Sequence, residues 1–320
     1  MAGRATVQPI SYGGWEHNLR LSNGEVELVV TLDIGPRIMR YAPLGGANVL
    51  KEVTEALGGL GEDTWKIRGG HRLWIAPEDP VRTYVLDNSP IEHAVIAAGA
   101  GCRVRVTAPA DSRFGIEKTL EIELGDRGSD VTLVHRVRNL SSAPTELAIW
   151  AITVMAQGGT EIVPLPSGRN HPGLDARSAE DFAPHLTMAL WPYFRFDDPR
   201  VLLGRRCVRL RQDPEASGPT KLGFAHRAGW AAYVNRGLGF VKRFGYEEGA
   251  RYPDGGCNYE TYTDAGFLEM ETLGPLVRLE PGGETSHMER WSLLKDAPAP
   301  ESEEIVESAL FPRISSRVPI

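Results

Sequence analysis

Apolar and polar residues alternate with a period of two through most of this chain. Because successive side chains of a strand point to opposite faces, this alternation predicts strands that bury one face. The clearest runs are residues 24–35, 102–109, 115–124, 130–140, 145–156, 206–213, 221–246, 258–274 and 284–295. Gly (35) and Pro (23) punctuate them at intervals of about 8–12 residues, which is typical of a sandwich or barrel. We therefore predict an all-β fold with one large antiparallel sandwich domain, residues 1–295.

Helical periodicity is confined to two short segments. Residues 47–59 show some helical periodicity. Residues 301–310 follow a Pro/Ala-rich linker, and Ser302 is placed as the N-cap of a helix there. We expect few short helices and a C-terminal tail, residues 296–320, that contains one of them. Residues 164–200 lack steady periodicity, and an irregular insertion of this length in a β-fold often forms a rim or lid over a site.

Bulk composition excludes several classes of partner. The net charge is −7 and there is no block of Lys or Arg, so nucleic acids and anionic membrane surfaces are not expected partners. The three cysteines are widely spaced and include no C-x-x-C, which argues against a disulfide framework or a thiolate zinc site. With no signal-peptide apolar region and no run of about 18 apolar residues, we expect a cytoplasmic location.

Two carboxylates stand close together in "GFLEMETLGP", residues 266–275. In a strand, Glu269 and Glu271 share one face, with Cα atoms ~6.5–7 Å apart, while Leu268 and Met270 occupy the other. In a cleft, their mutual repulsion and burial would raise the pKa of one of them, as acid–base catalysis at neutral pH requires. The alternative is an exposed strand face with two solvated charges.

A second group of polar residues lies in "GGHRLWIAPEDP", residues 69–80. Arg72 and Trp74 share a strand face and offer a bidentate donor beside an aromatic platform, which suits a sugar ring. Glu78 follows, and the Gly69-Gly70 pair would allow a ligand to approach the backbone closely. His71 points the other way in a regular strand, although a loop could turn it into a cleft. The alternative places Trp74 in the core and His71 against backbone partners.

Weaker candidates come from two other segments. Asn258 and Glu260 alternate with Tyr259 in "NYETYTD", but Gly266 interrupts the pattern, so their face relative to Glu269 stays open. Trp191 and Arg195 lie in the irregular insertion, where Arg195 could bind an acidic group; an exposed ion pair is the commoner fate of an arginine.

Other chemistries have no motif here. The sequence contains no G-x-S-x-G, no G-x-x-x-x-G-K-[ST], no H-E-x-x-H and no G-x-G-x-x-G that follows a strand and opens a helix. The eight histidines are scattered, so a metal site could be assembled only by the fold. We expect no metal and no cofactor.

Taken in order, "GGHRLWIAPE", "VRNLSSAP" and "GFLEMETLGPLVRLEPGGE" resemble the galactose mutarotase-like superfamily, and more narrowly a bacterial branch of it. The resemblance covers most of residues 20–295 and implies a β-supersandwich. In its aldose 1-epimerases and hexose-phosphate epimerases, the glutamate of the late "LE" strand is the general base, and Glu269 matches that position.

The chain also departs from that pattern. Mutarotases carry an "N-H-x-Y-F" motif after the mid-chain Asn, and its histidine is the general acid. Here the corresponding stretch is "AIWAITVMAQGG", which has no histidine. Glu271, His71, or His171 or His185 in the insertion could take that role.

The resemblance implies a carbohydrate as the ligand and an isomerase of the aldose 1-epimerase type as the activity. One alternative is a carbohydrate-binding or regulatory module that has lost the chemistry. Another is a sugar lyase or hydrolase on the same fold. A homodimer is a possible assembly.

Overall fold

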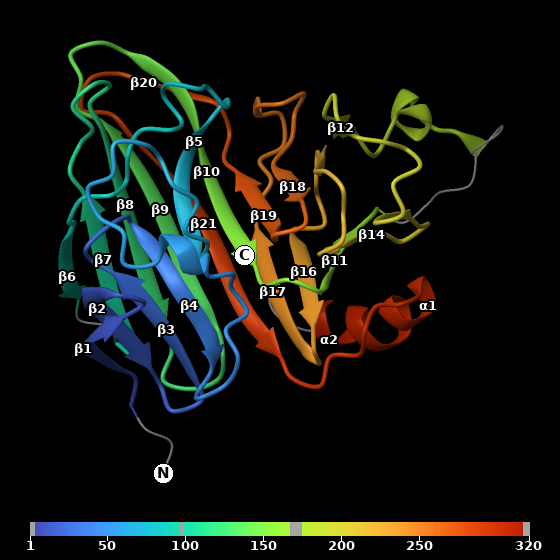
Figure 1. Ribbon diagram of the computed structural model, residues 1–320. Helices are drawn as coiled ribbons and strands as arrows, with labels where there is room; N and C mark the ends of the chain where they lie inside the picture. The colour runs from blue at the N-terminus through green and yellow to red at the C-terminus, as the bar shows by residue number, and fades with distance from the viewer. Residues whose placement is uncertain (1–3, 97–98, 167–174, 316–320) are drawn as a thin grey trace.

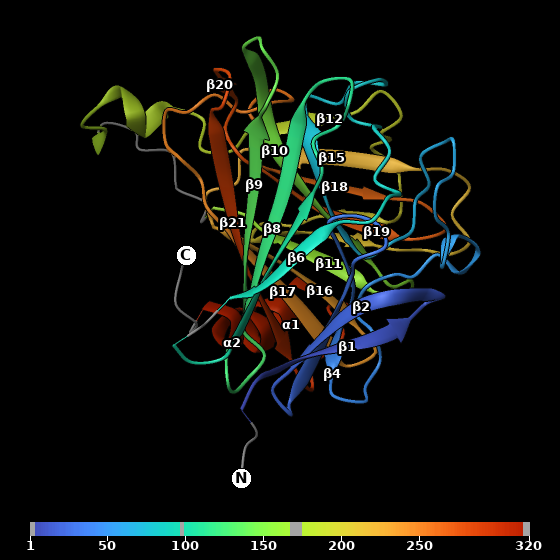
Figure 2. The same ribbon diagram turned by 90° about the vertical axis from the view of Figure 1, so that its left-hand side faces the viewer.

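The strands predicted from the alternation form two antiparallel sheets. The computed structural model describes residues 4–96, 99–166 and 175–315, and in this part of the chain the sheets have 11 and 10 strands. The all-β prediction is confirmed. In Figure 2 strands of the first sheet such as β15 (Thr220–Phe224) and β18 (Tyr259–Thr263) run across the direction of β8 (Ile116–Leu124) and β9 (Val131–Asn139) of the second.

The first sheet carries the candidate site. Its order is β1 (Thr6–Tyr12), β2 (Trp15–Ser22), β3 (Val26–Thr31), β4 (Arg37–Pro43), β5 (His71–Ala76), β10 (Thr145–Met155), β19 (Leu268–Leu273), β18, β15 and β12 (Met188–Leu190), with β20 (Val277–Leu279) paired to β10 outside this path. The neighbours β5, β10 and the consecutive pair β18 and β19 (Leu268–Leu273) come from three distant parts of the sequence (Figure 1).

The second sheet packs against the first. Its order is β13 (Val201–Leu203), β14 (Cys207–Arg211), β11 (Thr160–Pro164), β16 (Trp230–Asn235), β17 (Leu238–Phe244), β21 (Glu284–Leu294), β9, β8, β7 (Cys102–Ala108) and β6 (Glu92–Ile96). The main core lies between the sheets, where Leu222, Met270 and Tyr259 of the first meet Leu133, Phe240 and Trp291 of the second.

Burial differs between the outer and the central strands. In β8 and β9 buried residues mostly alternate with partly exposed ones, as expected for a sheet with one covered face. In β5 and β19 every residue is buried, so both of their faces are covered. The residues 269 and 271 are therefore not on a solvent-exposed strand face.

The two glycines before β5 approach other backbone segments. Gly69 and Gly70 have φ of +80° and +70°, and a Cβ on them would lie 2.0 Å from the carbonyl oxygen of Lys51 and 2.3 Å from that of Ile38. Only glycine fits such contacts. In this structure their close approach is to the protein's own backbone.

The helical predictions were partly right. Residues 47–59 contain only one 3-10 turn, η1 (Thr54–Ala56). The tail does form helix: α1 (Glu303–Ile305), the π-helical η4 (Val306–Leu310) and α2 (Phe311–Ser315), with the Ser302 hydroxyl accepting the Ile305 N–H at 3.2 Å. This segment lies beside β16 and β17 in both views (Figure 1 and Figure 2) and packs Val306, Leu310 and Ile314 against Ala232, Val234 and Val241.

Within the described ranges, no helix has the length and apolar character needed to cross a membrane.

Candidate functional site

Strand register places the candidate carboxylates on one sheet face. Arg72, Ile152, Glu271 and Glu260 are successive cross-strand partners on β5, β10, β19 and β18, and directly opposed residues project to the same side. The neighbouring row is Val154, Glu269, Tyr262 and Lys221. This face is the one opposite Met270, which belongs to the core between the sheets.

Glu269 is held by an arginine that rests on indole rings. Arg72 Nη1 donates to Glu269 Oε1 at 2.8 Å, and its guanidinium carbon lies 4.2 Å from the ring centre of Trp74 and 5.4 Å from that of Trp65. Glu269 is 8% exposed, whereas Glu271 is 1% exposed. Glu269 is thus the more accessible of the two strand glutamates.

A lysine that the sequence reading did not single out lies between two other carboxylates. Lys221 Nζ is 2.8 Å from Glu260 Oε2 and 3.0 Å from Glu271 Oε2. Its ammonium also lies over the rings of Trp150 and Trp191, 4.7 and 4.6 Å from their centres. The only sequence signal for it was a lysine that opens an otherwise apolar strand.

Burial and mutual repulsion disturb the ionisation of this group. Burial raises the pKa of Glu260 well above its ordinary value, with the charge of Glu271 adding to the effect and Lys221 opposing it. Burial also raises the pKa of Glu271. Burial lowers the pKa of Lys221, but the two carboxylates outweigh that effect and raise it overall, so the lysine stays an ammonium.

A cavity of about 480 Å³ opens beside Lys221 and Glu260. This volume is within the range of small-molecule sites, which is roughly 300–1,000 Å³. Its lining combines aromatic rings with charged groups and consists of Glu78, Pro80, Tyr84, Trp150, Trp191, Lys221, Asp254 and Glu260. Tyr84 donates its hydroxyl hydrogen to Glu78 at 2.6 Å. Flat rings beside hydrogen-bonding carboxylates are the chemistry with which proteins hold polyhydroxylated rings.

The structure brings together most of the residues selected from the sequence. Glu78, Trp191 and Glu260 line the cavity, while Arg72, Trp74, Glu269 and Glu271 lie on the same sheet face through the contacts above. Trp150, Lys221, Tyr84 and Asp254 are additions. Gly266 does not shift the pairing of β18 with β19, so Glu260 shares the Glu269 face.

Three selected residues lie elsewhere. His71 projects to the core side of the regular strand β5, is 0% exposed and contacts Thr153. Asn258 is 0% exposed and its side chain bonds the backbone of His226 and Gly245. Arg195 is exposed, pairs with Asp197, and lines a separate depression.

His185 supplies no acid near Glu269 in the described contacts. His185 is exposed and does not line the cavity, and His171 lies outside the described residues. The irregular segment does contribute Trp191 to the cavity.

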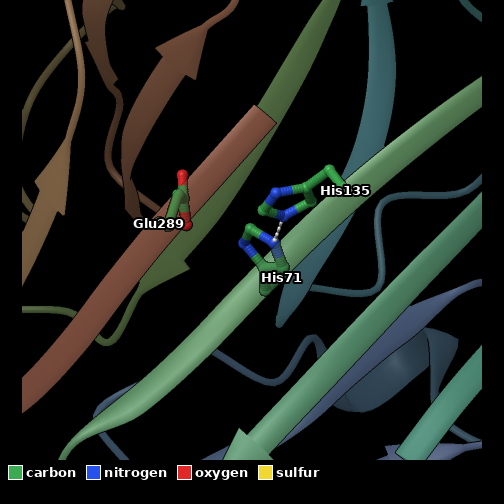
Figure 3. Close-up of side chains that lie close together, drawn as sticks. All are labelled: His71, His135 and Glu289. Carbon is green, nitrogen blue, oxygen red and sulfur yellow. Dashed lines mark hydrogen bonds between the residues drawn. The ribbon is translucent and has the colours of Figure 1, made fainter. Parts of the chain in front are cut away.

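One group of potential metal ligands converges between the sheets. Among the described residues, His71, His135 and Glu289 each offer a ligand atom within 4.8 Å of the others (Figure 3). Hydrogen bonds among protein groups already use these atoms. His135 Nδ1 lies 3.1 Å from the carbonyl oxygen of His287. Because a carbonyl oxygen can only accept, Nδ1 of the neutral His135 ring carries the hydrogen. The other ring nitrogen, Nε2, therefore accepts a hydrogen bond from His71 Nε2 at 2.7 Å.

Both carboxylate oxygens of Glu289 also have partners within the protein. Glu289 Oε1 lies 2.9 Å from Lys242 Nζ and accepts from Thr272, and Oε2 accepts from Trp291 Nε1 at 2.8 Å. Burial lowers the pKa of both His71 and His135, so both rings are neutral. The cluster is a closed polar network of the core, with an ammonium beside the carboxylate.

Sequence comparison finds no relative: no protein-family model and no curated protein matches the chain.

Comparison of structures does find relatives of the fold. A proposed aldose 1-epimerase from Klebsiella pneumoniae is similar with a TM-score of 0.61 at 11% identity, over 98% of this chain and 87% of its own. A galactose mutarotase-like protein from Lactobacillus casei gives 0.56 at 10% identity, over 87% of this chain and 100% of its own.

A TPR-domain containing protein from Parabacteroides distasonis gives a TM-score of 0.58 at 14% identity, over 93% of this chain. This chain spans 54% of that protein's length. At such identities the likeness concerns the fold. The resemblance seen in the ordered sequence motifs is confirmed at that level: the chain has the β-supersandwich fold of the galactose mutarotase-like proteins.

Proposed function

We propose that this protein binds a sugar in the cavity beside Trp150, Lys221 and Glu260 and interconverts its anomers, as an aldose 1-epimerase does. The proposal rests on the cavity itself, whose lining combines the rings of Trp150, Trp191 and Tyr84 with the buried Glu260 and the ammonium of Lys221. The aldose 1-epimerase and mutarotase descriptions of proteins with this fold support it.

In the proposed reaction Glu269 is the general base. It takes the proton of the anomeric hydroxyl while the ring oxygen receives a proton from a donor, so the ring opens and recloses to either anomer. Arg72 fixes the carboxylate of Glu269 through the 2.8 Å bond to Oε1 and leaves Oε2 for substrate. Hydrogen bonds from Lys221 and stacking on the indoles of Trp150 and Trp191 would orient the sugar.

The ion pair of Arg72 with Glu269 also favours a second candidate function. Arg72 Nη1 already occupies Glu269 Oε1 at 2.8 Å, so one of the two carboxylate oxygens is not free to act on a substrate. A protein that binds sugar in the same cavity without turnover would tolerate this pairing.

Anomer exchange measured by proton NMR separates these functions. We expect catalytic amounts of protein to accelerate exchange in at least one of a panel of aldoses, and Glu269→Gln to lower kcat by about 10²–10⁴-fold. Glu284→Gln is a matched control, because Glu284 is an exposed strand glutamate of the other sheet. Turnover that survives Glu269→Gln would remove the assignment of the base. Saturable binding without exchange would favour the binding module, and new products would indicate a lyase or hydrolase.

A further inference from the structure

The buried charges of the cavity do not balance. Glu260 and Glu271 are direct cross-strand partners on β18 and β19, 0% and 1% exposed, and Lys221 is the cation that both contact. Arg72 is paired with Glu269 instead. Two like charges at this spacing in a low-dielectric site cannot both be stable with one counter-charge. One of the two carboxyl groups therefore keeps a proton.

Hydrogen bonding identifies which one. Glu271 Oε2 accepts from Trp150 Nε1 at 2.9 Å and from Lys221 at 3.0 Å, and two donors on one oxygen stabilise a carboxylate. Glu260 has only the ammonium at 2.8 Å. The Oε1 atoms of Glu260 and Glu271 both lack a hydrogen-bond partner among the described residues, but of the two residues only Glu260 lines the cavity.

We propose that Glu260 is the proton donor of this cavity, a neutral carboxylic acid that gives its proton to a substrate oxygen. The inference rests on the proposed function, for which it supplies the missing partner of Glu269. The two glutamates are diagonal neighbours on β19 and β18, about 7–8 Å apart at the backbone.

The step balances without a co-reactant. Glu269 removes the proton of the anomeric hydroxyl, whose oxygen forms a carbonyl with C1, the bond from C1 to the ring oxygen breaks, and the ring oxygen takes the proton of Glu260. Reclosure on the other face of the carbonyl reverses both transfers and restores the starting protonation of the two glutamates.

The groups around Glu260 come from four segments. They are Lys221 on β15, Glu271 on β19, Asp254 and Cys257 in the turn before β18, and Tyr193 after β12. Burial raises the pKa of Cys257 to about 12 and that of Tyr193 to about 12, so neither adds negative charge at neutral pH. Asp254 repels a charge on Glu260.

Carbon-13 NMR of protein labelled at glutamate carboxyl groups tests the proton directly, without any sugar. We expect one signal, lost in Glu260→Gln, to hold its protonated shift through neutral pH. In Glu271→Gln the repelling charge is gone, so the same signal should move to the ionised position at lower pH. Thermal unfolding of each variant checks that it is folded.

Kinetic and binding measurements test whether Glu260 donates its proton to the substrate. Glu260→Gln should lower kcat for anomer exchange by about 10²-fold or more with a smaller change in KM, while Glu284→Gln changes neither. Sugar binding by the wild type should weaken as pH rises through the titration of Glu260, and binding by Glu260→Gln should not follow that titration.

The outcomes separate this proposal from the proposed function. If no aldose is turned over but the protonated signal and the pH-dependent binding are found, the isomerase assignment fails, and Glu260 stands as a neutral carboxylic acid that donates a hydrogen bond to the bound sugar. A Glu260 signal that is ionised at neutral pH overturns the donor role, whatever the turnover. Exchange unaffected by Glu260→Gln, or an absence of pH-dependent binding in a protein without turnover, overturns it as well.

Discussion

Lys242 and Glu289 form an ion pair in the core between the sheets, and both are 0% exposed. Lys242 Nζ also lies 3.0 Å from the carbonyl oxygen of Met270. Burial opposes the charge of Glu289, but Lys242 outweighs it and holds the pKa of this carboxyl below its ordinary value. Burial lowers the pKa of Lys242, with the charge of Glu289 acting against that effect, and the 2.9 Å contact between the two groups keeps both charged.

Removing one member of this pair should therefore be costly. We expect Lys242→Met to lower the free energy of unfolding by roughly 3–5 kcal/mol, because it leaves a buried charge without a partner. The double variant with Glu289→Leu should recover much of the loss, and Lys295→Met, at an exposed lysine, should change little. Urea denaturation measures the free energy of unfolding of all three variants. If Lys242→Met lost no more stability than Lys295→Met, the buried ion pair would be contradicted.

At the scale of elements, the entry to β5 depends on glycine. Gly70 combines φ of +70° with a backbone carbonyl 2.3 Å from where a Cβ would stand, whereas Gly45 has φ of +68° and nothing within 4 Å. The loss of stability in Gly45→Ala therefore measures the effect of the positive φ alone. We expect Gly70→Ala to destabilise by roughly 1–3 kcal/mol more than Gly45→Ala in chemical denaturation. Equal losses would mean that the close approach is unimportant.

Strands that bury only one face were predictable from the sequence, and the other elements were less so. The alternation in residues 115–124 and 130–140 identified β8 and β9, because one face packs and the other is partly exposed. In β19 the same alternation indicated a wet face for Glu269 and Glu271. That reading was incomplete because rings and strands distant in the sequence, including Trp150 and Lys221, cover this face. Residues 47–59 have apolar spacing that serves loop packing instead of a helix.

Stability of the whole molecule should respond to pH through its buried histidines. His226 packs against Phe244 and Tyr259, with ring centres 5.3 and 5.8 Å away, and burial lowers its pKa to about 4. The unfolded chain takes up this proton near pH 6.5 and the folded chain does not, so unfolding gains protons between about pH 6.5 and 4. This residue therefore removes stability as pH falls, by about 1.4 kcal/mol per pH unit.

Replacing that ring should flatten the pH dependence. Between pH 6.5 and 4, His226→Phe should become more stable relative to the wild type as pH falls, while His185→Phe, at an exposed histidine, should leave the slope unchanged. Urea titrations at several pH values measure this difference. Parallel curves for the wild type and His226→Phe would show that His226 is protonated equally in the folded and unfolded chains.

At the scale of the whole molecule, the fold was predictable from the two-residue period of the strands and from the order of three short motifs. Both features can be recognised even where sequence identity is low. The cavity did not follow, because it is assembled from β10, β15, β18 and three connecting segments, those around Tyr84, Trp191 and Asp254. Strand parity did place His71 opposite Arg72. It could not relate Glu260 to Glu269, since that relation depends on the register of β18 with β19.

The most direct test of the central claim is a crystal structure of this protein soaked with an aldose that it binds in solution. We expect a pyranose ring in the cavity against Trp150 and Trp191, with its anomeric hydroxyl at Glu269. A sugar ordered at another surface, such as the depression beside Arg195, with this cavity free of it, would contradict the account.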